Sequence, residues 1–516
     1  MVTALGALSA LLLPRIQGRA APKLAIYALA AVALLAVLTE LVLTTWSLLS
    51  PTYLDHIEAS TASNAQYFRQ GIALYPDLSS YTLHGLVYGP LLAELNSLGY
   101  LVGTGVLASK LVGWVAAWLA VALLVSMPAA GGRRWQWVAA TATVLCILAS
   151  FGSVLTADRA DSLLVLGATA GFFAVLRCPG LASLAVVAVL AGAAADLKLH
   201  GPIYFMPALY WWIRGQTERP LAGWLSAAAV ALVAGLLAIS LPFLPGNVSL
   251  HGYLVYLGLA SRHGLAWGEL GWNIAFLADL WTPVALVLVA TRAMPPALRT
   301  FASVLFAFEL LAAVIAAKPG AGIHHLLPFL CFHAFLMQRM LAVASEQPQG
   351  ESRALQGATA ALVVLVLGIA WPAGGSFRHL LEFDLQLPRQ EATLTELRSL
   401  SHRYPRGMLG IADASSYDLT SFRPWLTLIG TPQTDYGALM DLKLSGVSDA
   451  PLALALARCA IPYLYMPRQG VPFSMTNRYG GPLFSDEVRE QFLQRYALLA
   501  SGTQFNVYKC EPDQAR

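Results

Sequence analysis

Residues 24–49, LAIYALAAVALLAVLTELVLTTWSLL, form a long apolar run that is followed at once by an acidic segment, residues 51–76, PTYLDHIEASTASNAQYFRQGIALYP. The run is long enough to cross a membrane, because about 20 apolar residues in a helix span a hydrocarbon core of about 30 Å. Carboxylates directly after a crossing lie at a membrane surface. Together the two stretches predict a membrane protein with polar chemistry at one surface.

The composition of the whole chain supports a bilayer environment. Apolar residues make up 57% of the 516 residues and charged residues 12%, against about 45–50% and about 25% in soluble domains. The 32 Lys and Arg and 28 Asp and Glu leave a net charge of +4 without runs of like charge, which argues against a nucleic-acid partner. The five cysteines show no spacing typical of a zinc site.

The apolar runs predict an all-α polytopic membrane domain over residues 1–373. We expect eleven crossings, at 24–49, 107–127, 136–156, 161–177, 181–198, 201–214, 221–245, 271–291, 299–317, 323–342 and 355–373. Every second loop is rich in Arg and Lys, which favours the cytoplasmic side for these loops and for the N-terminus. The alternate, more acidic loops then face outward, and an odd number of crossings puts the C-terminus outside.

Residues 374–516 have a different composition, with frequent charged residues and short β-like runs between polar helical stretches such as residues 485–500. This pattern predicts a soluble extracytoplasmic α/β domain. Its acids Asp413, Asp418, Asp435 and Asp441 are scattered, and we expect them in solvated positions. Cys459 and Cys510 are its only cysteines, and outside the cytoplasm they can form a disulfide; two separate buried thiols are the alternative.

The first outer loop, residues 50–106, is long for a connection between membrane helices, and such loops are often functional. If residues 55–68 form a helix, Asp55 and Glu58 share one of its faces. The pair could supply a general base, bind a cation, or cap the helix. The spacing alone favours capping.

Other outer-loop residues are candidates for binding a substrate. Asp158 and Asp161 flank Arg159, which fits either a salt-bridged helix end or substrate orientation. Lys198 precedes a Gly-Pro turn, although a lysine at a helix end often only reaches for the interface. His324 and His325 lack a third ligand that would indicate a metal site. Further candidates are Tyr88, Arg262 and Lys318.

The order of these features resembles the GT-C clan of membrane glycosyltransferases, and within it the family 39 branch of protein O-mannosyltransferases and lipid A aminoarabinose transferases. An acidic motif after the first crossing is followed by Gly71, Leu74 and Tyr75, and then by Tyr-Gly-Pro-Leu at 88–91. Residues 156–163, TADRADSL, are similar to the family's Arg-x-Asp segment, and residues 197–207, LKLHGPIYFMP, to its Lys-Gly-Pro turn. The resemblance covers roughly residues 24–345.

The resemblance implies transfer of a sugar from a polyprenyl-phosphate donor to a glycan, lipid or protein acceptor on the outer face of the membrane, with inversion. The high alanine content and the lack of a eukaryotic targeting signal indicate a bacterial inner membrane. Asp55 is then the first candidate for the base and Glu58 the second. The sequence departs from the family pattern here, since two residues separate the acids, which the family has adjacent. Cations at the outer helix ends, Lys198 foremost, would hold the phosphate. The cavity should form from the first loop and the loops near residues 158, 198 and 320.

Two other kinds of function are also compatible with the sequence. A transporter or flippase of a lipid-linked glycan would favour duplicated halves and polar residues in mid-membrane, and a non-catalytic assembly subunit would use the outer domain to bind a partner. The sequence shows no cofactor motif, and it leaves open the sugar, the acceptor and the need for a divalent metal.

Overall fold

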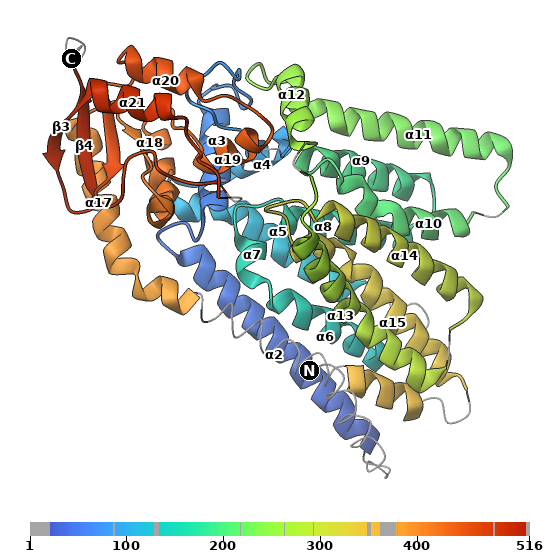
Figure 1. Cartoon of the computed structure of the whole chain (residues 1–516). Helices are drawn as coiled ribbons and strands as arrows, with labels where there is room; N and C mark the ends of the chain where they lie inside the picture. The colour runs from blue at the N-terminus through green and yellow to red at the C-terminus, as the bar shows by residue number, and fades with distance from the viewer. Residues whose placement is uncertain are drawn as a thin grey trace.

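The computed structural model describes residues 21–85, 88–127, 134–216, 218–262, 264–292, 294–347, 352–361, 378, 380–477 and 480–511. Most of these residues are helical, and a small sheet lies near the C-terminal end (Figure 1). Within these described residues, six helical segments are long and apolar enough to cross a membrane: Ala30–Leu49 within α2 (Ala21–Leu49), α5 (Val106–Ser126), Leu221–Phe243 from α11 (Leu221–Ser240) and η3 (Leu241–Phe243), α13 (Trp267–Thr291), α14 (Pro296–Ile315), and Ile323–Ser345 from η4 (Ile323–Phe329) and α15 (Leu330–Ser345).

The remaining predicted crossings correspond to shorter helices. The run 136–156 is divided between α6 (Arg134–Ala149) and α7 (Gly152–Thr156), and the runs 161–177 and 181–198 form α8 (Asp161–Arg177) and α9 (Leu181–Leu197). The run 201–214 begins with a 3-10 turn, η2 (Gly201–Phe205), before α10 (Met206–Arg214). Of the run 355–373, residues 362–373 lie outside the described residues. The count of eleven crossings therefore stays a prediction.

Helix α11 shows how the apolar runs are used. Its Leu232, Val233, Leu236 and Leu237 are all more than half exposed. An apolar patch of this kind on the surface needs a partner or a lipid environment. In contrast, α15 is almost wholly buried among the other helices. The helix bundle therefore has a packed interior and an apolar rim that suits contact with lipid.

The C-terminal sheet has four strands in the order β1-β2-β4-β3. Strand β1 (Met408–Leu409) pairs with β2 (Tyr463–Pro467) in parallel, while β4 (Phe505–Cys510) pairs antiparallel with both β2 and β3 (Tyr496–Ser501). Side chains alternate between its faces, as strand geometry requires: Leu464 and Met466 pack against α21 (Asp486–Arg495), while Tyr465 packs toward α17 (Leu387–Arg403). The sheet therefore lies between two helical layers.

One helix of the C-terminal region ends earlier than the sequence predicts. The sequence predicts one helix over residues 485–500, whereas α21 ends at Arg495 and Tyr496 begins strand β3. Short apolar runs such as 496–500 are compatible with either conformation. Here the backbone of β4 decides, because Tyr496 pairs with Cys510 and the strand completes the edge of the sheet.

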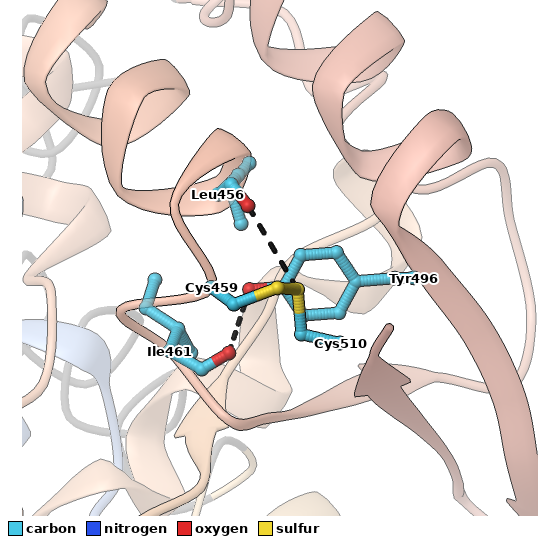
Figure 2. Close-up of a disulfide and its surroundings, with 5 residues drawn as sticks. All are labelled: Leu456, Cys459, Ile461, Tyr496 and Cys510. Carbon is cyan, nitrogen blue, oxygen red and sulfur yellow. Dashed lines mark hydrogen bonds between the residues drawn. A yellow bond between two sulfur atoms is a disulfide. The ribbon is translucent and has the colours of Figure 1, made fainter. Parts of the chain in front are cut away.

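Cys459 and Cys510 are joined by a disulfide with 5.6 Å between their Cα atoms. The bond ties the loop after α20 (Ala450–Ala457) to the last strand (Figure 2). Tyr496 lies beside it and donates its hydroxyl hydrogen bond to the Ile461 carbonyl at 2.6 Å. The disulfide therefore closes the side of the sheet where the chain ends.

Helix α3 (His56–Arg69) connects the membrane helices with the C-terminal region. It packs on α4 (Pro90–Gly99) on one side and on α18 (Arg423–Leu428) and α19 (Tyr436–Leu444) on the other (Figure 1). The buried Arg423 guanidinium donates to the His56 carbonyl at 3.1 Å and pairs with Asp435 at 3.1 Å. This contact holds the start of α3 between the two parts of the molecule.

Candidate functional site

Asp55 begins helix α3. The helix expected from Asp55 onward is present, with Asp55 as its N-cap, and its Oδ1 atom accepts hydrogen bonds from the backbone N–H groups of Ile57 and Glu58, both at 2.9 Å. A carboxylate suits this position because it satisfies free N–H groups and faces the positive end of the helix dipole. The capping interpretation is therefore confirmed for Asp55.

The second oxygen of Asp55 has a different partner. Oδ2 forms an ion pair with the Arg159 guanidinium. Burial raises the pKa of Asp55, but Arg159 and the Glu58 N–H outweigh that effect, so the pKa lies below its ordinary value. The Asp55 side chain remains 34% exposed. Asp55 is therefore a charged carboxylate that is fixed in place and still open to a reactant.

Glu58 lies in a different environment although it is one helical turn away. Its side chain is completely buried, and Oε2 pairs with the Lys110 ammonium at 3.2 Å and accepts from the Leu54 N–H at 2.6 Å. Burial raises the pKa of Glu58, although Lys110 opposes the rise. A group without exposed surface is better suited to positioning Leu54 and Asp55 than to touching a substrate.

Asp158 is buried behind this pair. Burial raises the pKa of Asp158 well above its ordinary value, and the negative charges of Glu58 and Asp55 act in the same direction. A hydrogen bond with Ser109 and the charge of Lys110 oppose this rise. Asp158 and Asp161 thus have separate environments despite their spacing, since Asp161 pairs with Lys198.

Lys198 does not extend to the interface. Its side chain is 2% exposed, and its ammonium group is 2.7 Å from Asp161 Oδ1 and 3.4 Å from His325 Nε2. The Tyr88 ring lies against it, with 5.6 Å from Nζ to the ring centre. Of the two interpretations of this lysine, the structure favours an inward-facing cation.

Two glycines allow these groups to meet. A Cβ atom on Gly89 would lie 1.9 Å from the Asp196 carbonyl oxygen, and one on Gly201 would lie 2.1 Å from the Ala194 carbonyl oxygen. Only glycine tolerates such close backbone contact. Gly89 thereby brings the segment of Tyr88 onto the end of α9, and Gly201 folds the turn after Lys198 back over the same helix.

A cavity of about 400 Å³ opens beside these residues. The first outer loop, the turn after α9, the loop at 318–321 and helix α19 all contribute to its wall. Its polar lining residues are His56, Ser60, Tyr88, Lys198, His200, Ser261, Lys318, His325 and Asp441. Asp55 itself does not line it, although the next two residues, His56 and Ile57, do, and residue 158 and its neighbours do not line it either. The cavity therefore carries more cationic than anionic groups.

The other predicted binding residues fall into two groups. Lys318 lines the cavity, with its Nζ atom 3.4 Å from the Ala260 carbonyl. His324 interacts electrostatically with Asp161, Lys198 and Arg159. In contrast, Arg262 is exposed and reaches the Ser445 carbonyl at 3.5 Å, so it contacts α19 and not the cluster around Lys198.

Sequence reasoning missed several residues of this site. His200 lines the cavity and lies 3.1 Å from His325, and it stands only two positions after Lys198 in the quoted turn. Lys110 is the cation of Glu58, but its position within an apolar run concealed it. The only signal for either residue is a polar side chain close to an already suspected element.

The expectation that the C-terminal acids are solvated is wrong in part. Asp435 is buried, caps α19 and pairs with Arg423, and Asp441 lines the cavity. Asp413 caps a 3-10 helix, η5 (Ala414–Phe422). Caps and cavity walls depend on distant segments, which a scattered pattern of acids does not reveal. Among the residues described, no group of three or more His, Cys, Asp or Glu is arranged to hold a metal ion.

Comparison with known proteins places this geometry in a known fold. No protein-family model and no curated protein matches the chain. Solved structures do match, among them ArnT from Cupriavidus metallidurans bound to undecaprenyl phosphate, with a TM-score of 0.59 at 13% identity, and the same protein in the apo state, with a TM-score of 0.52 at 14% identity. Each match covers 94% of this chain and 98% of the other. The fold is similar to that of ArnT.

The resemblance to the GT-C clan that the sequence indicates is thereby confirmed at the level of the fold. At 13–14% identity the ArnT likeness does not transfer individual residues. What it adds is that the membrane helices and the C-terminal region follow one arrangement along nearly the whole chain.

Proposed function

We propose that the protein is a membrane glycosyltransferase that moves a sugar from a polyprenyl-phosphate donor to an acceptor hydroxyl on the outer face of the membrane. The observation that carries the proposal is the position of an ionised, partly exposed Asp55 directly before His56 and Ile57, which line a cation-rich cavity. The ArnT-like fold supports it, because one of those structures holds undecaprenyl phosphate.

The cavity suits the phosphate of the donor. Lys198 and Lys318 supply ammonium groups, and His200 and His325 line the cavity beside them. A leaving phosphate gains negative charge as its bond to the sugar breaks, and fixed cations stabilise that charge. The exposed apolar helices nearby leave the prenyl tail in lipid. Lys198 is our principal phosphate ligand, with Asp161 holding it in position.

Asp55 is our candidate for the general base. In the proposed reaction the acceptor oxygen attacks the anomeric carbon, its proton passes to Asp55, and the bond from that carbon to the phosphate oxygen breaks. A single displacement of this kind inverts the anomeric configuration. Arg159 keeps Asp55 ionised and fixes its orientation, while Glu58 and Lys110 support the start of α3 from behind.

The proposal includes an orientation in the membrane. The basic loops and the N-terminus face the cytoplasm, and residues 374–516 form an outer domain that covers the site through α19. An inner-membrane location in a bacterium agrees with the composition. Running the transfer assay with and without a chelator tests whether the reaction needs a divalent metal.

The test begins with cells that lack the protein. We expect an accumulated prenyl-phosphate sugar and a missing sugar on a lipid, glycan or protein; an unchanged profile of both would contradict the function. For the donor site, the purified protein in nanodiscs is titrated with undecaprenyl phosphate. The double variant Lys198→Met, Asp161→Asn removes the charge pair together and should lose binding, whereas Lys509→Met, at an exposed lysine of β4, should not.

A further inference from the structure

A second large cavity is lined by the segment just before Asp55. Its volume is about 490 Å³, and Thr52, Tyr53 and Leu54 form part of its wall. The first cavity begins at His56 and Ile57. Asp55 therefore stands at the boundary in the chain between two separate cavities, with its carboxylate partly exposed.

The second cavity belongs largely to the C-terminal region. Its wall comes from α17 and the residues before it, from η5 and α18, and from the ends of β2 and the β3–β4 turn. The Thr52 hydroxyl hydrogen-bonds the Gln390 side chain of α17, which joins the first outer loop to this wall. The backbone of Leu54 is fixed from beneath by Glu58.

The lining of the two cavities differs in charge. The second has two cations, Arg389 and Arg468, and two anions, Glu382 and Asp418, whereas the first has Lys198 and Lys318 against Asp441. The second is also rich in neutral polar side chains, with glutamines at 386, 390, 469 and 504. A balanced wall of amides and hydroxyls suits a ligand that offers many hydroxyl groups, not a phosphate.

An aromatic group adds to this match. Trp425 lines the cavity, and its indole Nε1–H is buried without a hydrogen-bond partner. The Arg398 guanidinium lies 4.5 Å from the ring centre on the ring face, so the ring is held in place. A buried donor without a partner costs free energy unless a ligand or water satisfies it.

We propose that this second cavity binds the acceptor, and that the acceptor is a glycan whose hydroxyl groups meet the glutamines and Trp425. The inference rests on the proposed glycosyltransferase function. Donor and acceptor then approach Asp55 from the two cavities that residues 52–54 and 56–57 line. The C-terminal region thereby determines which acceptor is used.

The test fills the cavity without touching the donor site. Ser421 and Gln386 line the second cavity from different elements, and neither side chain has a hydrogen bond among those that the structure describes. Ser421→Trp and Gln386→Trp are expressed in cells that lack the native protein. Ser399→Trp is the matched control, because Ser399 is an exposed residue of α17 outside the cavity.

Each cavity-filling variant should reduce the sugar decoration at least tenfold, and undecaprenyl phosphate binding in nanodiscs should stay within twofold of the native value. Retained binding of undecaprenyl phosphate also verifies that each variant folds. Two variants are used so that a local folding defect in one of them does not decide the result. Full decoration by both folded variants would overturn the acceptor site alone. Loss of phosphate binding by both would also overturn it, since it makes the cavity part of the donor site. A native protein that neither binds the phosphate nor decorates would overturn the function itself.

Discussion

The Asp55 carboxylate caps helix α3 with one oxygen and pairs with the Arg159 guanidinium through the other. The two partners come from residues more than 100 positions apart in the sequence. The same side chain is therefore a structural cap and an oriented charge. Its functional and structural roles can be separated, because asparagine preserves the cap but not the charge.

Asp55→Asn should abolish transfer while the protein folds normally. An amide oxygen still accepts from the backbone N–H groups of α3, but an amide cannot take a proton, so the rate should fall by about 10²–10⁴-fold. Asp55→Ala should in addition lower the free energy of unfolding by about 0.5–2 kcal/mol through loss of the cap. Transfer assays and thermal unfolding of both variants check this, and full activity of Asp55→Asn would exclude Asp55 as the base.

The pH dependence should reveal the role of Arg159. Because Arg159 holds the pKa of Asp55 below its ordinary value, the ionised form persists at neutral pH, and activity should decline only as the pH falls below the ordinary aspartate range. The stability that the ionised group contributes is likewise present above its unfolded pKa and is lost as the pH falls through the lower folded pKa. In Arg159→Met the guanidinium no longer lowers the pKa of Asp55, so the upward effect of burial on that pKa is less opposed.

The acid limb of the kcat/KM profile should therefore move to higher pH in Arg159→Met. The comparison variant is Arg378→Met, because Arg378 is an exposed arginine that pairs with Glu382, and its profile should match that of the native protein. An acid limb at the same pH in Arg159→Met would show that Asp55 does not limit the reaction.

The buried pair of Glu58 and Lys110 should matter for stability. Lys110→Met leaves the Glu58 carboxylate buried without its cation, which should cost about 3–5 kcal/mol. Lys110→Met combined with Glu58→Gln should recover part of that loss, since neither charge then remains. Thermal unfolding in detergent measures the difference. If the single and double variants unfold alike, the two residues are not coupled.

The disulfide should stabilise the C-terminal region. Its two cysteines are 51 positions apart in the sequence. Loss of a disulfide that closes such a loop typically lowers the free energy of unfolding by about 2–4 kcal/mol. Cys459→Ser with Cys510→Ser should thus unfold at a lower temperature and become sensitive to proteolysis after β2. Cys178→Ser, at an exposed free cysteine, should have no effect. An unchanged melting temperature in the double variant would argue against a structural role.

Much of the architecture was predictable from local patterns. Long apolar runs such as 107–127 and 221–245 became membrane-length helices, α5 and the segment from α11 into η3, because a bilayer imposes a minimum length on any crossing. The helix after Asp55 also followed from neighbouring residues in the sequence. Strand β3 did not, since its conformation depends on pairing with β4.

Individual residues of the site were predictable from the sequence, but the ion pairs between them were not. Asp55, Lys198, Lys318 and His325 were each recognisable as polar residues at the ends of apolar runs. No pattern in the sequence indicated that Arg159 would pair with Asp55 or Lys110 with Glu58. Such partners depend on which helices pack together.

By itself, the sequence determined the environment of this protein, the helical class and the surface on which its titratable groups gather, because hydrophobicity and charge act on each residue locally. The tertiary structure alone decided that Asp55 is exposed and Glu58 is buried, and that α19 completes the cavity. Those outcomes depend on contacts between distant segments, where burial and neighbouring charges fix the state of each group.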